Sequence, residues 1–249
     1  RPEALVSMVR GYLEASRGRA ALPVPPKALI APHAGYIYSG PVAGSAYGAL
    51  PEGRLGAIRR VVLVGPAHRV GFYGIAAPTN EAFETPLGAV PVDQEGVERV
   101  VRLPTVFRFD DPHETEHSLE VQLPFLQCLL QDFTVIPLLV GSASGEEVSR
   151  ALEIVWGDED TLVVVSSDLS HYLDYATARE MDTHTSEAIA ALRPEAIQPG
   201  QACGHVPVQG LLLSARHHGL EGRVLDQRSS GDTAGPREPV VGYGAYAFH

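Results

Sequence analysis

The chain has 249 residues, of which 45% are hydrophobic and 20% are charged, a composition typical of a globular protein with a sizeable core. Its formal net charge is −11 and Lys27 is its one lysine, which argues against nucleic acid or an anionic membrane as a partner. No apolar run approaches the ~18 residues of a membrane span. Two cysteines, Cys128 and Cys203, are too few for a disulfide framework, so we expect a cytoplasmic location.

The first half of the chain alternates strand and helix patterns. Apolar residues at helical spacing predict a helix over residues 3–17 that ends at Gly18. The next expected elements are a strand at 27–31, a helix from Ser39 to about Leu50 and a buried strand at 59–65. Short strands separated by turns between residues 72 and 92 indicate a hairpin or flap beside the main sheet.

The second half continues the alternation. Asp93 is expected to cap a helix that runs to about Leu103, and residues 117–131 are expected to be helical, with Pro124 ending or bending the helix. Further strands are expected at 133–141, 161–168, 222–230 and 240–249, with helices at 144–156, 174–192 and 204–218. The pattern predicts a single α/β domain over residues 1–249, with a central, mainly parallel or mixed sheet flanked by helices.

Histidines follow three of the expected buried strands. His33, His68 and His171 each come just after such a strand, and Asp168 lies three residues before His171. In open α/β sheets, ligands bind in the crevice outside the carboxyl ends of the strands. A single loop histidine is more often a surface residue than a metal ligand, but three at equivalent positions favour a common site.

Cys203 is the other candidate ligand. It lies near the start of an expected helix, where backbone N–H groups favour the thiolate, and thiolate with imidazole is a ligand set for zinc, copper or iron. Cys128 lies among apolar residues and is expected to be an inert core thiol. The sequence contains no CxxC pair, so we expect distant segments to assemble any metal site.

Other polar residues have weaker assignments. His117, beside Glu116 and Glu120, either caps a helix within a charge network or lines the pocket, and His205 is expected to support Cys203. Tyr36, Tyr38 and Tyr172 either line the pocket or pack near strand ends. The remaining histidines are expected to be solvated: His113, His184, His217, His218 and His249. The motifs of serine hydrolases (GxSxG), P-loops and dinucleotide-binding folds are absent from the sequence.

Five ordered motifs carry a resemblance to a known family. The stretches APHAGYIYSG, GPAHRV, EHSLEVQLPF, SSDLSHY and CGHVP, in this order, resemble the MEMO family, also called AmmeMemoRadiSam system protein B. The resemblance runs from about residue 27 to the final GAYAFH. It implies a fold shared with the class III extradiol (LigB-type) non-heme iron dioxygenases.

The resemblance also implies roles for particular residues. His33, His68 and Cys203 match the metal ligands, and iron or copper is the implied ion, with zinc as a further candidate. His171 matches the acid/base histidine of the dioxygenases, with Asp168 and His117 beside it. The dioxygenases use two histidines and a carboxylate, so the cysteine puts ring-cleaving activity in doubt.

Two functions stay open at this point. The first is a metal-dependent oxidoreductase that acts on a small molecule or peptide in the metal crevice. The second is a non-catalytic module that uses the same crevice to bind a metal or a (phospho)peptide. The family name implies radical SAM and AMMECR-type proteins as partners.

Overall fold

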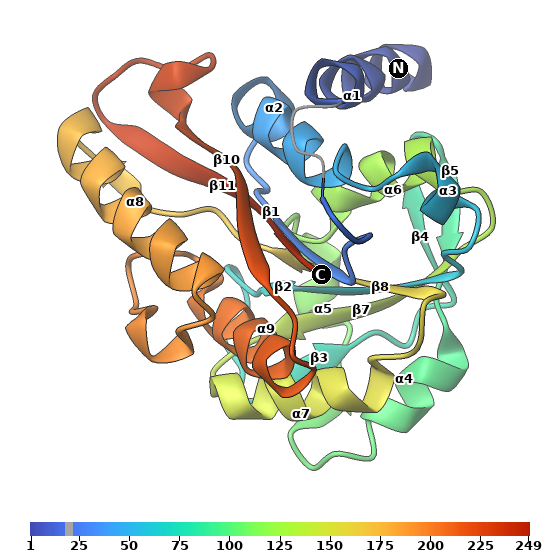
Figure 1. Cartoon of the computed structure of the whole chain (residues 1–249). Coiled ribbons are helices and arrows are strands. Elements are labelled where there is room, and N and C mark those ends of the chain that lie inside the picture. Colours follow the sequence, from blue (N-terminus) through green and yellow to red (C-terminus); the bar gives the residue numbers. More distant parts are fainter. Residues whose placement is uncertain (18–21) are drawn as a thin grey trace.

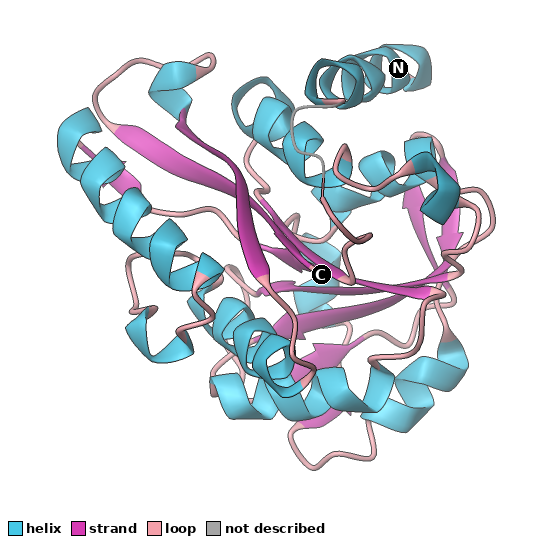
Figure 2. Ribbon diagram, viewed as in Figure 1, coloured by secondary structure: helices cyan, strands magenta, loops and turns pink. Residues whose placement is uncertain are grey.

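A nine-stranded mixed sheet forms the centre of the computed structural model, which describes residues 1–17 and 22–249 (Figures 1 and 2). Four neighbouring strands at its centre run parallel, in the order β1 (Ala28–Ala31), β8 (Thr161–Ser166), β2 (Arg60–Pro66) and β7 (Thr134–Val140). Their β-branched residues are buried on both faces, as their nearly continuous apolar sequences predict.

Antiparallel strands extend the sheet at both edges. Beside β1 lies β11 (Val240–Phe248), which pairs with both β10 (Gly222–Ser229) and β9 (His171–Leu173). Beside β7 lies β3 (Ile75–Ala77), followed by β6 (Val106–Arg108). The predicted hairpin is present as a separate two-stranded sheet of β4 (Ala82–Thr85) and β5 (Gly88–Pro91). The architecture confirms the predicted α/β class.

Helices cover both faces of the sheet (Figure 1). One face carries α1 (Pro2–Ser16), α2 (Tyr36–Tyr47) and α6 (Leu123–Leu129). The opposite face carries α4 (Gln94–Val100), α7 (Gly145–Val155) and α9 (His205–His217). Helix α8 (Tyr175–Ala190) packs against β10 and β11, and two short helices are α3 (Glu52–Leu55) and α5 (Asp111–Thr115). No helix within the described residues is long and apolar enough to cross a membrane.

The predicted cap at Asp93 and the predicted helix start at Ser144 are confirmed, but the predicted helix start at Ser39 is wrong. The Asp93 carboxylate accepts a hydrogen bond from the Gly96 amide (2.9 Å), and Ser144 forms a full capping box with Glu147. Ser39, in contrast, lies inside α2, which already begins at Tyr36. Its hydroxyl donates back to the Ala34 carbonyl (2.7 Å), because Gly35 makes the turn into the helix directly after His33.

The helix expected over residues 117–131 is shorter than predicted. The amides of His117 and Ser118 both donate to the Glu116 carboxylate (3.0 Å each), so these residues form a loop and not a first helical turn. A 3-10 turn at Glu120–Gln122 then leads into α6, and Pro124 lies in its first turn, where no N–H is needed.

His113 was expected to be solvated, but it is 9% exposed. Its Nε2 lies 3.0 Å from the Ala76 carbonyl oxygen, because α5 packs this side chain against β3. Gly18, the expected end of the first helix, lies outside the described residues.

Candidate metal centre

Three candidate residues occupy equivalent positions after neighbouring strands. Strands β1, β8 and β2 are adjacent and parallel, and His33, Asp168 and His68 each lie two residues beyond the last residue of one of them. Their side chains therefore meet at one edge of the sheet. The Asp168 carboxylate accepts a hydrogen bond from the His33 amide (2.8 Å), which ties two of these loops together.

Cys203 joins this edge from the loop before α9. Its Sγ lies 3.3 Å from His33 Nε2, and the donor atoms of His33, His68 and Cys203 all lie within 4.8 Å of one another. The His33 and His68 rings meet edge to face, with centroids 5.3 Å apart. Metal–nitrogen bonds of about 2.0–2.1 Å and metal–sulfur bonds of about 2.3 Å require donors at nearly this separation. The geometry thus fits one ion.

The surrounding hydrogen bonds fix which nitrogen of His33 faces the cluster. The Ser166 hydroxyl donates to the Ser118 carbonyl (2.6 Å) and accepts from Gln122 Nε2 (2.8 Å). Its remaining lone pair accepts from His33 Nδ1 (2.8 Å), so this nitrogen carries the proton. His33 Nε2 then presents a lone pair towards Cys203. Burial lowers the pKa of His33, which favours the neutral, metal-binding imidazole.

Glu116 fixes which ring nitrogen of His68 carries the proton, as Ser166 does for His33. Its buried carboxylate lies 3.1 Å from His68 Nδ1 and accepts the His68 amide (2.6 Å). Burial raises the pKa of Glu116, but hydrogen bonds from His68 and from backbone amides outweigh it and lower the pKa to about 2. The carboxylate is therefore ionised and accepts a hydrogen bond from His68 Nδ1–H. This leaves His68 Nε2 as the donor atom towards a metal.

We expect Glu116→Gln to weaken metal binding by about 10–100-fold, because an amide no longer fixes the His68 tautomer as a carboxylate does. Glu114→Gln is a matched control, since it removes the same charge from an exposed position in the same segment. Metal titration of both variants checks this expectation. Equal affinities in the two variants would show that Glu116 does not orient His68.

A close backbone approach places Cys203. The Cys203 amide donates to the Asp168 carbonyl (3.2 Å), and the Asp168 amide points at Cys203 Sγ (3.3 Å). A Cβ at Gly204 would lie 2.8 Å from the Ser167 Cβ, so only glycine lets this loop reach the end of β8.

The expected thiolate at Cys203 is wrong for the metal-free chain. Burial, together with the charge of Asp168, raises the pKa of Cys203 to about 12 and outweighs the helix N-terminus. The thiol is therefore protonated at neutral pH without a cation. A bound metal ion would supply the positive charge that stabilises a thiolate at this position.

An apolar cavity adjoins the cluster at His117. The His117 ring lies 6.2 Å from the rings of both His33 and His68, and its side chain is 53% exposed. It lines a cavity of about 340 Å³ together with Tyr36, whose hydroxyl donates to the Val121 carbonyl (2.8 Å). Most of the other lining residues are apolar, including Leu5, Pro86 and Pro124. This cavity offers room for a ligand close to the three donor residues.

His171 begins β9, with its Nδ1 2.9 Å from the Leu169 carbonyl. Since a carbonyl accepts only, Nδ1 carries the proton and Nε2 is free to accept one. Within the described residues, no hydrogen bond or ring contact joins His171 to the three donor residues. The buried Asp182 carboxylate accepts the Ser170 amide (3.0 Å) and holds the start of this strand.

Burial raises the pKa of Asp182 to about 6. Because the folded state holds this proton more tightly than the unfolded chain, its contribution to stability is present at low pH and is lost as pH rises through about 6. We expect Asp182→Asn to gain about 2 kcal/mol in free energy of unfolding, relative to the wild type, between about pH 4.5 and pH 8. Urea unfolding of both proteins at the two pH values measures this. A constant difference between them would contradict a raised pKa.

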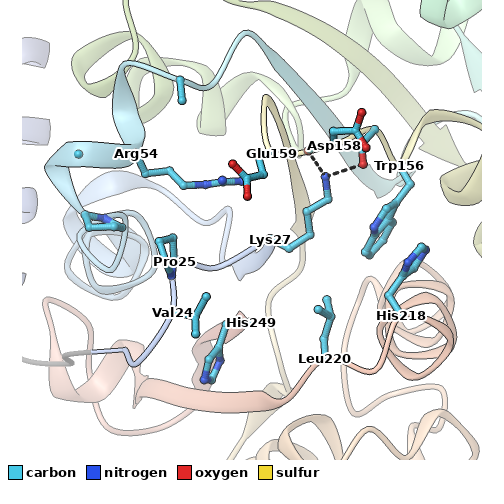
Figure 3. Close-up of a pocket in the computed structure, with 14 residues that line it drawn as sticks. Val24, Pro25, Lys27, Arg54, Trp156, Asp158, Glu159, His218, Leu220 and His249 are labelled. Carbon is cyan, nitrogen blue, oxygen red and sulfur yellow. Dashed lines mark hydrogen bonds between the residues drawn. The ribbon is translucent and has the colours of Figure 1, made fainter.

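The remaining predicted site residues lie outside these contacts. His205 is the first residue of α9, and its amide donates to the Ala202 carbonyl (3.2 Å). Tyr172 is 75% exposed and has a left-handed backbone (φ 58°), and Tyr38 is 37% exposed. A cavity of about 860 Å³ at the opposite edge of the sheet contains none of the predicted site residues (Figure 3).

Comparison with known proteins gives matches over nearly the whole chain. The family model described as Memo-like protein matches residues 1–247. This chain belongs to the Memo-like family. A MEMO1 family protein of Saccharolobus islandicus strain Y.N.15.51 is 36% identical over 235 residues, which cover 88% of this chain and 81% of that protein. A MEMO1 family protein of Archaeoglobus fulgidus is 34% identical, over 99% of this chain and 94% of that protein. A MEMO1 family protein of Aquifex aeolicus is 38% identical, over 88% of this chain and 85% of that protein.

A crystal structure of an uncharacterized protein from Escherichia coli K12 shares the Memo-like fold seen here. The two superpose with a TM-score of 0.51 and 15% sequence identity, over 87% of this chain and 98% of the other. At this identity the likeness concerns the fold alone.

Three residues that orient the imidazoles of His33 and His68 were not predicted from the sequence. Glu116 was expected only as a charged neighbour of His117, and Ser166 and Gln122 had no expected role. Glu116 directly precedes a candidate pocket histidine, and Ser166 ends the strand before Asp168. These sequence positions alone do not show that Glu116 contacts His68 or that Ser166 contacts His33, because both contacts join segments that are distant in the sequence.

Proposed function

We propose that His33, His68 and Cys203 hold one iron or copper ion and that the protein uses it for redox chemistry on a small molecule. The convergence of the three donor atoms carries this proposal, since they lie within 4.8 Å of one another. Independent acceptors, Ser166 and Glu116, bind the Nδ1 atoms of His33 and His68, so that both Nε2 atoms are available as metal donors. Such oriented supports are typical of metal-binding histidines.

The donor set bears on the choice of ion. A thiolate with two imidazoles suits copper(I) and iron, and also zinc, better than the hard ions that prefer oxygen. Structural zinc sites usually have four protein ligands, whereas this cluster has three and adjoins a cavity, which favours a site with an open position. A thiolate in place of a carboxylate distinguishes it from the two-histidine, one-carboxylate sites of extradiol enzymes, so ring cleavage is not the proposed reaction.

The bound ion would supply electron transfer and polarisation of a coordinated group. The chain itself would position the substrate and move protons. Asp168 holds the backbone of His33 and, through its amide, the sulfur of Cys203. His171 Nε2, which has no hydrogen-bond partner among residues 1–17 and 22–249, would accept or return a proton, with the ring held by the Leu169 carbonyl.

The adjoining cavity favours an apolar substrate. Among its described lining residues there is no lysine or arginine, and Glu120 contributes a negative charge. Recognition of a phosphate group usually needs arginine or lysine. We therefore propose a small, largely apolar molecule as the ligand, and not a phosphorylated peptide.

The second candidate function is a metal-dependent binding module without turnover. The cysteine among the three donors favours it, because extradiol enzymes use a carboxylate there, and the adjoining cavity could bind a ligand without that chemistry. In this case the cavity would bind its ligand without changing it.

One experiment separates the two functions. Protein purified without oxygen is loaded with iron(II) or copper(I), and oxygen consumption is followed in air with catechols and with other small aromatic compounds. The redox function predicts consumption that requires both the metal and one of the compounds. Tight binding of such compounds without any consumption would overturn it and support the binding module.

A further inference from the structure

A second group of metal-ligating side chains lies at the ends of α7 and α9. Glu153 is in the last turn of α7, His217 is the last residue of α9, and His218 follows it. Their donor atoms lie within 4.8 Å of one another. We infer that Glu153, His217 and His218 bind a divalent transition-metal cation that clamps the two helix ends together.

The distances fit a single ion. His218 Nε2 lies 2.9 Å from Glu153 Oε2, and His217 Nε2 lies 4.0 Å from the same oxygen. Bonds of about 2.1 Å in a tetrahedral shell place donor atoms about 3.4 Å apart. The His217 side chain is 73% exposed, so a small rotation of this side chain can close the remaining gap.

His218 is held in place before a cation arrives. Its ring stacks on Trp156, with centroids 4.4 Å apart and planes 2° from parallel (Figure 3). Trp156 is 8% exposed, and the Lys27 ammonium lies 5.6 Å from its ring centroid. Lys27 Nζ in turn donates to the carbonyls of Gly157 (3.1 Å) and Asp158 (2.7 Å). A fixed imidazole loses little conformational entropy on binding a cation.

The carboxyl ends of the two helices contribute negative electrostatic potential, which favours a cation at this cluster. Helices α7 and α9 pack side by side and both end at this cluster. The carboxyl end of a helix carries partial negative charge, which stabilises a cation within the last turn. A plain Glu153–His218 hydrogen bond accounts for two of the three side chains. It does not account for the second imidazole, whose described polar contact is to the same carboxylate oxygen.

The donors define the class of cation. Two imidazoles and one carboxylate favour zinc, nickel or copper(II) over magnesium or calcium, which prefer oxygen donors alone. The group lies apart from the Cys203 cluster, since Lys27, which contacts Trp156, precedes β1 and His33 follows it. A cation bound only by the folded chain raises its stability. The site therefore acts as a structural clamp, independent of the proposed redox centre.

The chain contains a built-in reporter for this site. Trp156 is its one tryptophan, and it stacks on a proposed ligand. Nickel(II) is titrated into the full chain, stripped of metal with a chelator, at about pH 8 while tryptophan fluorescence is recorded. We expect saturable quenching in the wild type and in Cys203→Ser, and reversal by excess zinc.

Variants make the test specific. His217→Ala, at an exposed position, is expected to raise the nickel concentration at half-quenching by at least about tenfold, as is Glu153→Gln. His184→Ala, which removes an exposed histidine from α8, should leave the midpoint unchanged. Absence of quenching in the wild type, or a midpoint that His217→Ala does not move, would overturn the inference. Neither result depends on whether the Cys203 cluster binds metal.

Discussion

Cys203→Ser is expected to lower iron or copper affinity at the candidate centre by more than about 100-fold, because changes that only disturb the support of a ligand already cost about 10–100-fold. A serine hydroxyl is a hard, neutral donor and does not replace a thiolate for copper(I) or iron. The measurement is metal titration under anaerobic conditions, followed by elemental analysis of the gel-filtered protein.

Cys128→Ser provides the matched control. Cys128, the other cysteine of the chain, lies on α6 and packs, half-buried, against the hydrophobic core of the protein. Burial raises the pKa of this thiol. Cys128→Ser should retain wild-type metal content. Equal stoichiometry in the two serine variants would remove Cys203 from the ligand set.

His171→Ala is expected to lower metal-dependent turnover by about 10²–10⁴-fold while leaving metal content unchanged. The reason is that His171 Nε2 would move a proton and would not hold the ion. Oxygen consumption and elemental analysis on the same sample separate the two effects.

Added imidazole distinguishes proton transfer from a structural role. Free imidazole is expected to restore part of the turnover of His171→Ala, since it supplies the missing base, whereas a packing defect would not respond. A variant that loses its metal, or one that keeps full turnover, would show that His171 has a different role.

Much of the fold follows from local sequence patterns. The strands β2, β7 and β8 are runs of β-branched and aliphatic residues, and both faces are covered in the structure. The short strands β6 and β9 have three residues each, and they form because a neighbouring strand offers backbone partners. Local patterns contain no information about such partners, so these two strands were not predicted.

The candidate site was predictable for a topological reason. Parallel strands bring their carboxyl ends to the same end of the sheet. His33 and His68 lie just beyond β1 and β2, which both pair with β8, so their positions after the strands were sufficient to predict that they lie close together. The protonation of Cys203 and the orientation of His68 by Glu116 depend on burial and on loop contacts between distant segments. These properties appear only in three dimensions.

X-ray absorption at the metal edge of the loaded protein measures directly whether Cys203 binds the ion. We expect one sulfur scatterer at about 2.3 Å from the ion together with imidazole nitrogens. A coordination shell of nitrogen and oxygen alone would show that Cys203 is not a ligand and that the proposed centre is wrong.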